Sequence, residues 1–138
     1  MISVRKQEVV KLENVLHLYQ AVGWTNYTHQ PQMLEQALSH SLAIYLAHDG
    51  DSVVGLVRLV GDGFSSIFVQ DLIVLPSYQR QGIGSDLMKE ALGDFKDAYQ
   101  VQLVTEQTEK TLGFYRSLGF EILSTYDCTG MIWVDRKR

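Results

Sequence analysis

The chain has 138 residues, of which 46% are hydrophobic and 20% charged, so its composition excludes a disordered protein and suits a single domain, residues 1–138, with one core. Its 12 lysine and arginine residues against 16 aspartate and glutamate residues give a formal net charge of −4. This balance argues against a nucleic-acid-binding surface and mildly favours cationic partners.

The first third of the chain is predicted to hold a short strand and two helices. The strand is expected at residues 2–6, and the apolar residues of the stretch 9–22 recur at helical spacing. The turn-forming stretch 23–29, "GWTNYTH", interrupts this pattern. Pro31 then suits the first turn of a second helix that ends near Ser39.

The middle of the chain is predicted to form three strands separated by two turns. The strands are expected at residues 42–48, 52–60 and 65–76, and the turns at 49–51 and 61–63. The third strand is apolar on both faces except at Gln70 and Asp71, and such a strand belongs at the centre of a sheet. Two polar residues in its middle therefore require an explanation.

The last third alternates between helices and strands. An amphipathic helix is expected from Gly82 or Ile83 to Phe95, and a second helix ends at Gly119. This second helix covers residues 108–118, and a strand at 101–105 precedes it. Two further strands are expected at 120–127 and 130–135, around a turn at 128–130. The whole order predicts an α/β (α+β mixed) domain with a mixed sheet and helices on both faces.

Two glycines, Gly82 and Gly84, lie where the amphipathic helix begins, although glycine inside a helix costs roughly 0.5–1 kcal/mol relative to alanine. A helix N-terminus presents unpaired N–H groups and partial positive charge, and glycine lets a ligand approach that backbone closely. These features indicate a site for a phosphate or pyrophosphate. A simple turn before a helix is the alternative, and the stretch does not match the two common phosphate-binding loops.

The run "DLIVLPSYQRQGIGSDLM", residues 71–88, resembles the acetyl-CoA-binding segment of the GNAT superfamily of N-acetyltransferases. The signature of that family is [QR]-x-x-G-x-[GA] between a central strand and a helix, and here it spans residues 79–84. A second stretch, "LGFYRSLGFE" at 112–121, is similar to the family's tyrosine-bearing helix and "LGF" strand entry. The two motifs are in register, and the resemblance covers nearly the whole chain.

The resemblance implies the GNAT fold, with a mostly antiparallel sheet of about six to seven strands, a splayed V-shaped cleft and about four flanking helices. It implies acetyl-CoA as cosubstrate, with the pantetheine arm along the backbone of the central strand and the pyrophosphate on the backbone amides of the glycine turn. Arg80 either contacts a phosphate directly or lies along the surface. The expected cofactor-binding residues are Leu72, Ile73, Val74, Gln79, Arg80, Gln81, Gly82, Ile83, Gly84, Ser85, Thr108 and Tyr115.

Three candidate catalytic residues follow from the same resemblance. Tyr115 matches the family tyrosine near the thioester sulfur, where a phenol protonates the leaving thiolate; a packed core tyrosine is the alternative. Many relatives carry a Glu or His base where this chain has Gln70, which cannot accept a proton. Asp71 orients the amine, deprotonates it through water or satisfies buried donors, and strand alternation sends it to the opposite face from Gln70 unless a bulge intervenes. Thr108 stands where many relatives carry asparagine.

The acceptor is expected to be a small-molecule amine or a protein amine, and its pocket is expected to include Trp24, Tyr27, Phe68 and Gln70. Tyr45 and Arg58 are further candidates for its wall. The alternative for the loop aromatics is that they cap the core. Attack of a primary amine on acetyl-CoA in a ternary complex is the first functional hypothesis. A non-catalytic acyl-CoA-binding regulatory module is the second, and a nucleotide-binding protein is a weaker third.

Several classes of site and partner are not expected. Cys128 is the single cysteine, which excludes an internal disulfide, and the four histidines lack metal-ligand spacing, so no metal cofactor is predicted. The N-terminus lacks a secretory signal and no apolar run approaches the ~20 residues of a membrane span, so a cytoplasmic protein is expected. Nucleic acid and membrane are not expected partners, and a homodimer remains open.

Overall fold

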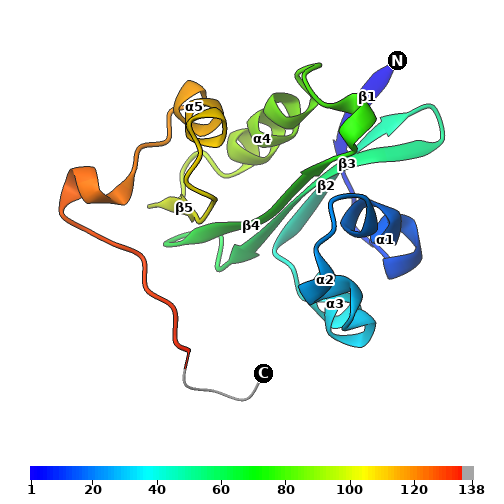
Figure 1. The fold of residues 1–138 in the computed structure, drawn as a ribbon, viewed down its shortest axis with the longest axis horizontal. Helices are drawn as coiled ribbons and strands as arrows, with labels where there is room; N and C mark the ends of the chain where they lie inside the picture. Colours follow the sequence, from blue (N-terminus) through cyan, green and yellow to red (C-terminus); the bar gives the residue numbers. More distant parts are fainter. Residues whose placement is uncertain (135–138) are drawn as a thin grey trace. The chain divides into compact units, whose positions relative to one another are not determined.

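A mixed sheet with α-helices on both faces forms the first of two compact units, Met1–Leu103, in the computed structural model, which describes residues 1–134 (Figure 1). The second unit begins at Val104, and each unit is described by itself. The expected α/β class with a mostly antiparallel sheet is confirmed. The expected strand and helix numbers are not, because the described residues hold five strands and five α-helices.

The sheet has the strand order β1-β2-β3-β4-β5, so sequential strands are neighbours. Strands β1 to β4 are antiparallel, and α4 connects β4 to the parallel β5. The predicted hairpin and the interior position of the third long strand are confirmed. The strands are β1 (Ile2–Lys6), β2 (Ala43–Asp49), β3 (Ser52–Gly61), β4 (Ile67–Val74) and β5 (Val101–Leu103).

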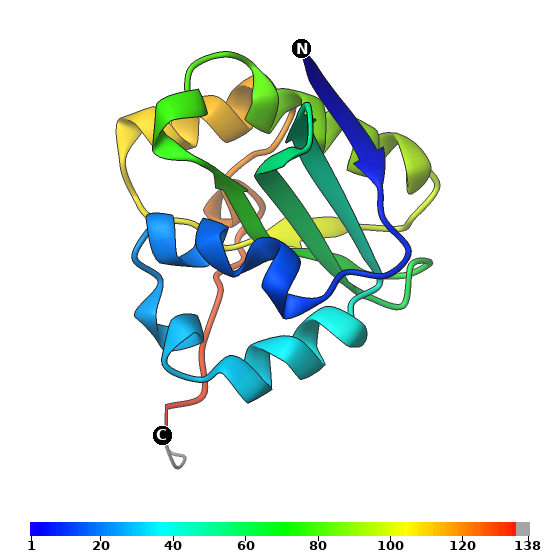
Figure 2. The same cartoon turned by 90° about the vertical axis from the view of Figure 1, so that its right-hand side faces the viewer.

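Three helices cover one face of this sheet, and one helix covers the other (Figures 1 and 2). The first group is α1 (Leu12–Ala21), the single-turn α2 (Thr25–Thr28) and α3 (Pro31–Ser39), and the opposite face carries α4 (Ile83–Asp94). Pro31 occupies the first turn of α3, as the sequence predicts. The core under the first three helices joins Leu18 and Leu34 to Leu56 of β3 and Ile73 of β4, all buried.

The second unit contains α5 (Glu109–Ser117), which begins and ends where the sequence predicts. Thr108 caps its start by accepting a hydrogen bond from the amide of Thr111 at 3.2 Å. At its end Gly119 adopts a φ of +97° and donates to the carbonyl of Arg116, while the amide of Phe120 donates to the carbonyl of Tyr115. These paired bonds form a Schellman motif, so the "LGF" stretch is a helix stop.

The two strands predicted near the C-terminus are wrong for the residues that the structure describes. Residues 120–134 contain a short 3-10 helix, Leu123–Tyr126, and no strand; position 135 lies outside the described part. Ile122, Met131 and Ile132 are largely exposed. Strand propensity reflects packing against neighbouring strands, and a segment rich in strand-forming residues does not form a strand without such a neighbour.

Candidate functional site

A β-bulge interrupts β4 at the two polar residues that the sequence singles out. Arg58 of β3 lies opposite Asp71 and Leu59 lies opposite Val69, which leaves Gln70 as an extra residue without a partner on β3. A bulge turns two successive side chains toward one side. Gln70 and Asp71 consequently both reach α2, and the expectation of opposite faces, which holds for a regular strand, does not apply.

Beyond this bulge, β4 has no strand partner on the side of β5 among residues 1–134. The parallel pairing begins at Ile67 with Val101 and ends at Val69 with Leu103, where β5 stops. Strand β4 continues to Val74, still paired with β3 on its other side. The main-chain groups of this half of β4 that point away from β3 thus lack a strand partner, and an extended ligand could pair with them.

Strand β4 leads directly into the glycine turn and the N-terminus of α4. A 3-10 turn at Pro76–Tyr78 is followed by Arg80 with a φ of +65° and by Gly82 with a φ of +82°. Nothing lies within 4 Å of the position that a Cβ of Gly82 would occupy, and no side chain caps α4. The turn therefore leaves open space beside uncapped helix amides, which suits an anion.

The bulge also lies over a buried polar cluster, which consists of Tyr19, Tyr27, Arg58 and Asp71. The Asp71 side chain is 2% exposed, and its Oδ2 accepts from Arg58 Nε at 2.7 Å and from the Tyr19 hydroxyl at 2.8 Å. Its Oδ1 accepts from the Tyr27 hydroxyl at 2.9 Å. Both carboxylate oxygens of Asp71 are therefore engaged by donors inside the protein.

The remaining donors of Arg58 reach Tyr27 and the end of α3. Arg58 Nη2 donates to the Tyr27 hydroxyl at 3.2 Å, and Nη1 donates to Ser41 Oγ at 3.2 Å. Burial opposes the charged guanidinium, but the charge and hydrogen bond of Asp71, together with Tyr19 and Tyr27, raise the pKa of Arg58 above its ordinary value. Burial together with the Asp71 charge likewise raises the pKa of both Tyr19 and Tyr27, so both phenols stay protonated and serve as donors.

The loop aromatics predicted for the acceptor pocket belong in part to this cluster. The Tyr19 ring makes edge contacts with Trp24 and Tyr27 at centroid distances of 6.1 and 5.1 Å. Trp24 packs on the core under α1–α3, and the Tyr27 ring carries the Arg58 guanidinium at 5.9 Å. The cation at the Tyr27 ring is therefore the protein's own Arg58. Phe68 is half-buried on β4, next to the bulge.

Tyr115 and Thr108 belong to the second unit, on α5 and at its N-cap. The Tyr115 ring contacts Phe114 and Phe120 edge-on at centroid distances of 5.0 and 5.9 Å. Burial raises the pKa of the Tyr115 phenol, which favours its protonated, donating form. The Thr108 hydroxyl is used within the helix cap, where it also donates to the Thr111 hydroxyl at 2.9 Å.

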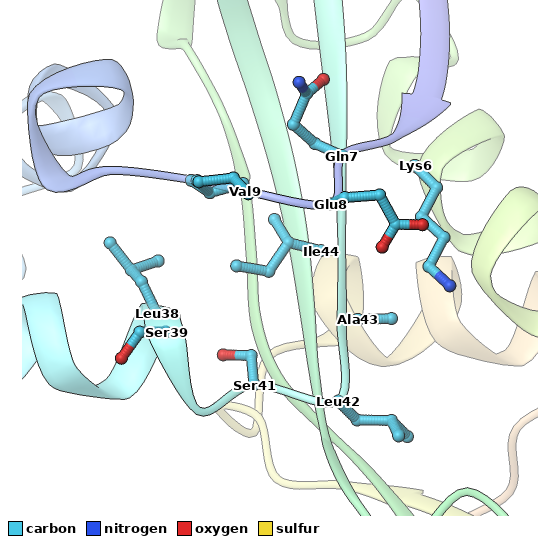
Figure 3. A pocket seen from close by; sticks show the side chains of 11 residues that line it. Lys6, Gln7, Glu8, Val9, Leu38, Ser39, Ser41, Leu42, Ala43 and Ile44 are labelled. Atoms are coloured by element: carbon cyan, nitrogen blue, oxygen red, sulfur yellow. The ribbon is translucent and has the colours of Figure 1, made fainter.

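A separate pocket of about 210 Å³ lies between the segment after β1 and the connection from α3 to β2 (Figure 3). Lys6, Glu8, Leu38 and Ser41 are among its lining residues. It adjoins β1 and β2, whereas the bulge and the glycine turn belong to β4, so it is not the site that the motifs predict. Within residues 1–134, no group of His, Cys, Asp and Glu side chains could hold a metal ion, and no helix is long and apolar enough to span a membrane.

The sequence suggested Arg58 only as a wall residue of the acceptor pocket and Tyr19 only as an apolar position of a helix, and it did not predict the ion pair of Arg58 with Asp71. A signal was present, because Arg58 interrupts the otherwise apolar run of its strand as Asp71 interrupts that of the next. Two opposite charges in adjacent strands, each in an apolar run, indicate a buried pair. Their alignment depends on the bulge, which the sequence alone does not place.

Comparison with known proteins agrees with this geometry. The model of the acetyltransferase (GNAT) domain matches residues 40–122. A GNAT-family acetyltransferase from Streptococcus pneumoniae is 80% identical, with a TM-score of 0.93 over 99% of this chain and 100% of that one. At 19% identity, the fold also matches that of PaiA N-acetyltransferase from Thermoplasma acidophilum in complex with coenzyme A, with a TM-score of 0.71 over 88% of this chain and 91% of that chain.

Curated plant relatives give the same result. Serotonin N-acetyltransferase 2, chloroplastic, from rice is 32% identical over 95 residues, which are 66% of this chain and 48% of the rice protein, so the match spans about half of that relative. GCN5-related N-acetyltransferase 1, chloroplastic, from Arabidopsis thaliana is 26% identical over 97% of this chain and 68% of that protein. This chain belongs to the GNAT superfamily of N-acetyltransferases.

Proposed function

We propose that this protein transfers the acetyl group of acetyl-CoA to a primary amine by direct attack in a ternary complex. The observation that carries the proposal is the continuity of β4. Its free edge after Val69 runs into the glycine turn and the uncapped N-terminus of α4. An extended chain with a diphosphate at one end matches this sequence of backbone donors and acceptors followed by an anion site.

The pantetheine arm is proposed to pair with the backbone of Leu72, Ile73 and Val74 on the edge that β5 leaves free. The pyrophosphate is proposed to lie on the amides from Arg80 to Ser85. Open space at Gly82 supports this placement, because a side chain there would occupy the room that the phosphates need. The coenzyme A complex of the Thermoplasma protein shows that a chain of this fold binds that ligand.

The amine nitrogen attacks the thioester carbonyl carbon, the carbon–sulfur bond breaks, and the thiolate needs a proton. Tyr115 is proposed to supply it as general acid. The raised pKa of its phenol supports that role, because a phenol that stays protonated can donate over the whole neutral range. Placing amine and thioester together supplies much of the remaining acceleration.

Asp71 is proposed to act by orienting other groups. Three internal donors bind its two oxygens, and its side chain is only 2% exposed, so a substrate amine has little access to the carboxylate. The proton of the attacking ammonium is then proposed to leave to water. A pH–rate profile that keeps its acidic limb in Asp71→Asn would support this assignment, and loss of that limb would restore Asp71 as the base.

The acceptor is a metabolite amine, a polyamine, an antibiotic amine or a protein lysine. The test is continuous release of free thiol from acetyl-CoA with serotonin, which the rice relative's name suggests, and with spermidine and a lysine-containing peptide. Turnover with any of them supports the enzyme. If a broader amine panel gives no turnover while calorimetry shows binding of coenzyme A, the regulatory module is favoured. The observation behind this alternative is that Asp71, the carboxylate of the described cluster at the bulge, is already bound by internal donors.

A further inference from the structure

We propose that Arg58, Asp71 and Tyr27 form a positioning chain that fixes the side-chain amide of Gln70, with its NH2 group toward Tyr27 and its carbonyl oxygen directed outward to accept an N–H of the acceptor amine. That the group bound by the Gln70 oxygen is an acceptor amine rests on the proposed function. The orientation of the amide rests on the hydrogen bonds of the cluster alone.

The first step is the direction of the Tyr27 hydroxyl proton. A guanidinium has donors only, and a carboxylate has acceptors only. Tyr27 lies between the two, at 3.2 Å from Arg58 Nη2 and 2.9 Å from Asp71 Oδ1. Its single proton must therefore go to Asp71, and its oxygen can only accept from Arg58.

The second step carries this polarity to Gln70. A phenol oxygen whose proton points at Asp71 has only lone pairs left for a third neighbour. Gln70 Nε2 lies 3.4 Å from that oxygen, the longest of the three hydrogen bonds at the Tyr27 hydroxyl. The opposite amide orientation would place Gln70 Oε1 against a lone pair of Tyr27. The cluster thus decides which end of the amide faces inward.

The third step is the position of the outward oxygen. Gln70 is exposed, it is the extra residue of the bulge, and β4 loses its partner β5 at the preceding residue, Val69. An oxygen there stands at the start of the free edge on which the thioester is proposed to lie. A neutral amide oxygen accepts a hydrogen bond from an amine without taking its proton, so it orients the nucleophile and leaves deprotonation to water.

The test compares Tyr27→Phe with the matched control Tyr19→Phe. Each substitution removes one phenol that donates to Asp71; Tyr27 also accepts from Arg58, and only Tyr27 contacts Gln70. With whichever of serotonin, spermidine or the lysine peptide is turned over, Tyr27→Phe should raise KM for the amine roughly three- to tenfold. KM for acetyl-CoA should not change, and Tyr19→Phe should leave both values near those of the wild type.

A double variant separates positioning from general damage. In a Gln70→Ala background, Tyr27→Phe should raise the amine KM no further, because the group that Tyr27 positions is gone. Equal KM increases in Tyr27→Phe and Tyr19→Phe, or full additivity of Tyr27→Phe with Gln70→Ala, would overturn the proposal.

A second readout needs no turnover. The side-chain NH2 resonances of Gln70, assigned by their loss in Gln70→Ala, should shift and exchange faster with solvent in Tyr27→Phe but keep their wild-type values in Tyr19→Phe. Unchanged resonances in Tyr27→Phe would overturn the amide orientation. If the resonances respond as expected while no amine is acetylated, the orientation is supported and the proposed function fails.

Discussion

Arg58 and Asp71 form an ion pair with Nε and Oδ2 2.7 Å apart, between side chains that are 4% and 2% exposed. They are direct partners across β3 and β4 at the bulge. Removing two charges from water costs several kcal/mol for each ion, and the pair is tolerated only when further hydrogen bonds satisfy both groups. Tyr19, Tyr27 and Ser41 provide those bonds.

The first prediction concerns the stability that this ion pair maintains. Asp71→Ala should lower the free energy of unfolding by about 3–5 kcal/mol, because it leaves the Arg58 guanidinium buried without its counter-charge. Urea unfolding followed by circular dichroism measures it. The control is the double substitution Arg58→Met and Asp71→Leu, which should cost less than Asp71→Ala alone. A loss below about 1 kcal/mol for Asp71→Ala would contradict the description of a desolvated pair.

The second prediction concerns the glycine turn. Gly82 has a φ of +82° and Gly50, in the hairpin between β2 and β3, has a φ of +61°, and nothing lies within 4 Å of either Cβ position. Alanine at either site should cost about 1–2 kcal/mol of stability through backbone strain. Only Gly82→Ala should weaken the binding of coenzyme A, and calorimetry should show a dissociation constant roughly tenfold higher, or about 1.4 kcal/mol of lost binding free energy. Wild-type affinity in Gly82→Ala would place the diphosphate elsewhere.

The third prediction concerns Tyr115. Tyr115→Phe keeps the ring contacts with Phe114 and Phe120 but removes the hydroxyl, so kcat should fall about 100-fold while KM for acetyl-CoA changes little. The exposed Tyr126 of the same unit offers the control, since Tyr126→Phe should leave kcat unchanged. Because burial raises the pKa of Tyr115, any alkaline limb due to this phenol should lie above pH 10. An unchanged kcat in Tyr115→Phe would remove the residue from the mechanism.

The fourth prediction concerns pH and the loop between β3 and β4. The Ser65 hydroxyl and the amides of Phe64, Ser65 and Ser66 donate to the Asp62 carboxylate and hold its pKa well below its ordinary value. A lowered pKa contributes stability that is present above the unfolded value of about 3.9 and is lost as the pH falls further. Thermal melts should show Asp62→Asn less stable than the wild type at pH 7.

The gap between these two proteins should close as the pH is lowered below about 4. The exposed Asp97 provides a comparison of the same chemistry outside this loop, and Asp97→Asn should melt close to the wild type at each pH. A gap for Asp62→Asn that is as large at pH 3 as at pH 7 would show that the effect is not one of ionisation.

Local patterns predicted the elements whose signals are complete within a few residues. Pro31 places the start of α3, Gly119 places the end of α5, and the two-sided apolar run places β4 in the interior of the sheet. Each of these signals acts through backbone geometry or burial of the same segment. The glycine turn before α4 belongs to the same class.

The features that were missed depend on a partner distant in sequence. Gln70 and Asp71 both reach Tyr27 of α2 because β4 slips by one residue against Arg58 and Leu59, and no residue of β4 alone specifies that slip. Residues 120–134 contain strand-forming apolar and aromatic residues, but such composition is not sufficient without a neighbouring strand. The sequence predicted Tyr27 only as an aromatic residue of a loop, whereas its ring packs against the Arg58 guanidinium and its hydroxyl accepts a hydrogen bond from Arg58 Nη2.

The pairing of β4 with β5 extends over only three residue pairs. After Val69, the hydrogen-bond ladder between β4 and β5 therefore does not continue along β4. A ligand that completes the ladder adds its binding free energy to the folded state, and the gain grows as RT ln(1 + [L]/Kd). If acetyl-CoA is that ligand, as proposed, the melting temperature of this chain should rise with the concentration of acetyl-CoA.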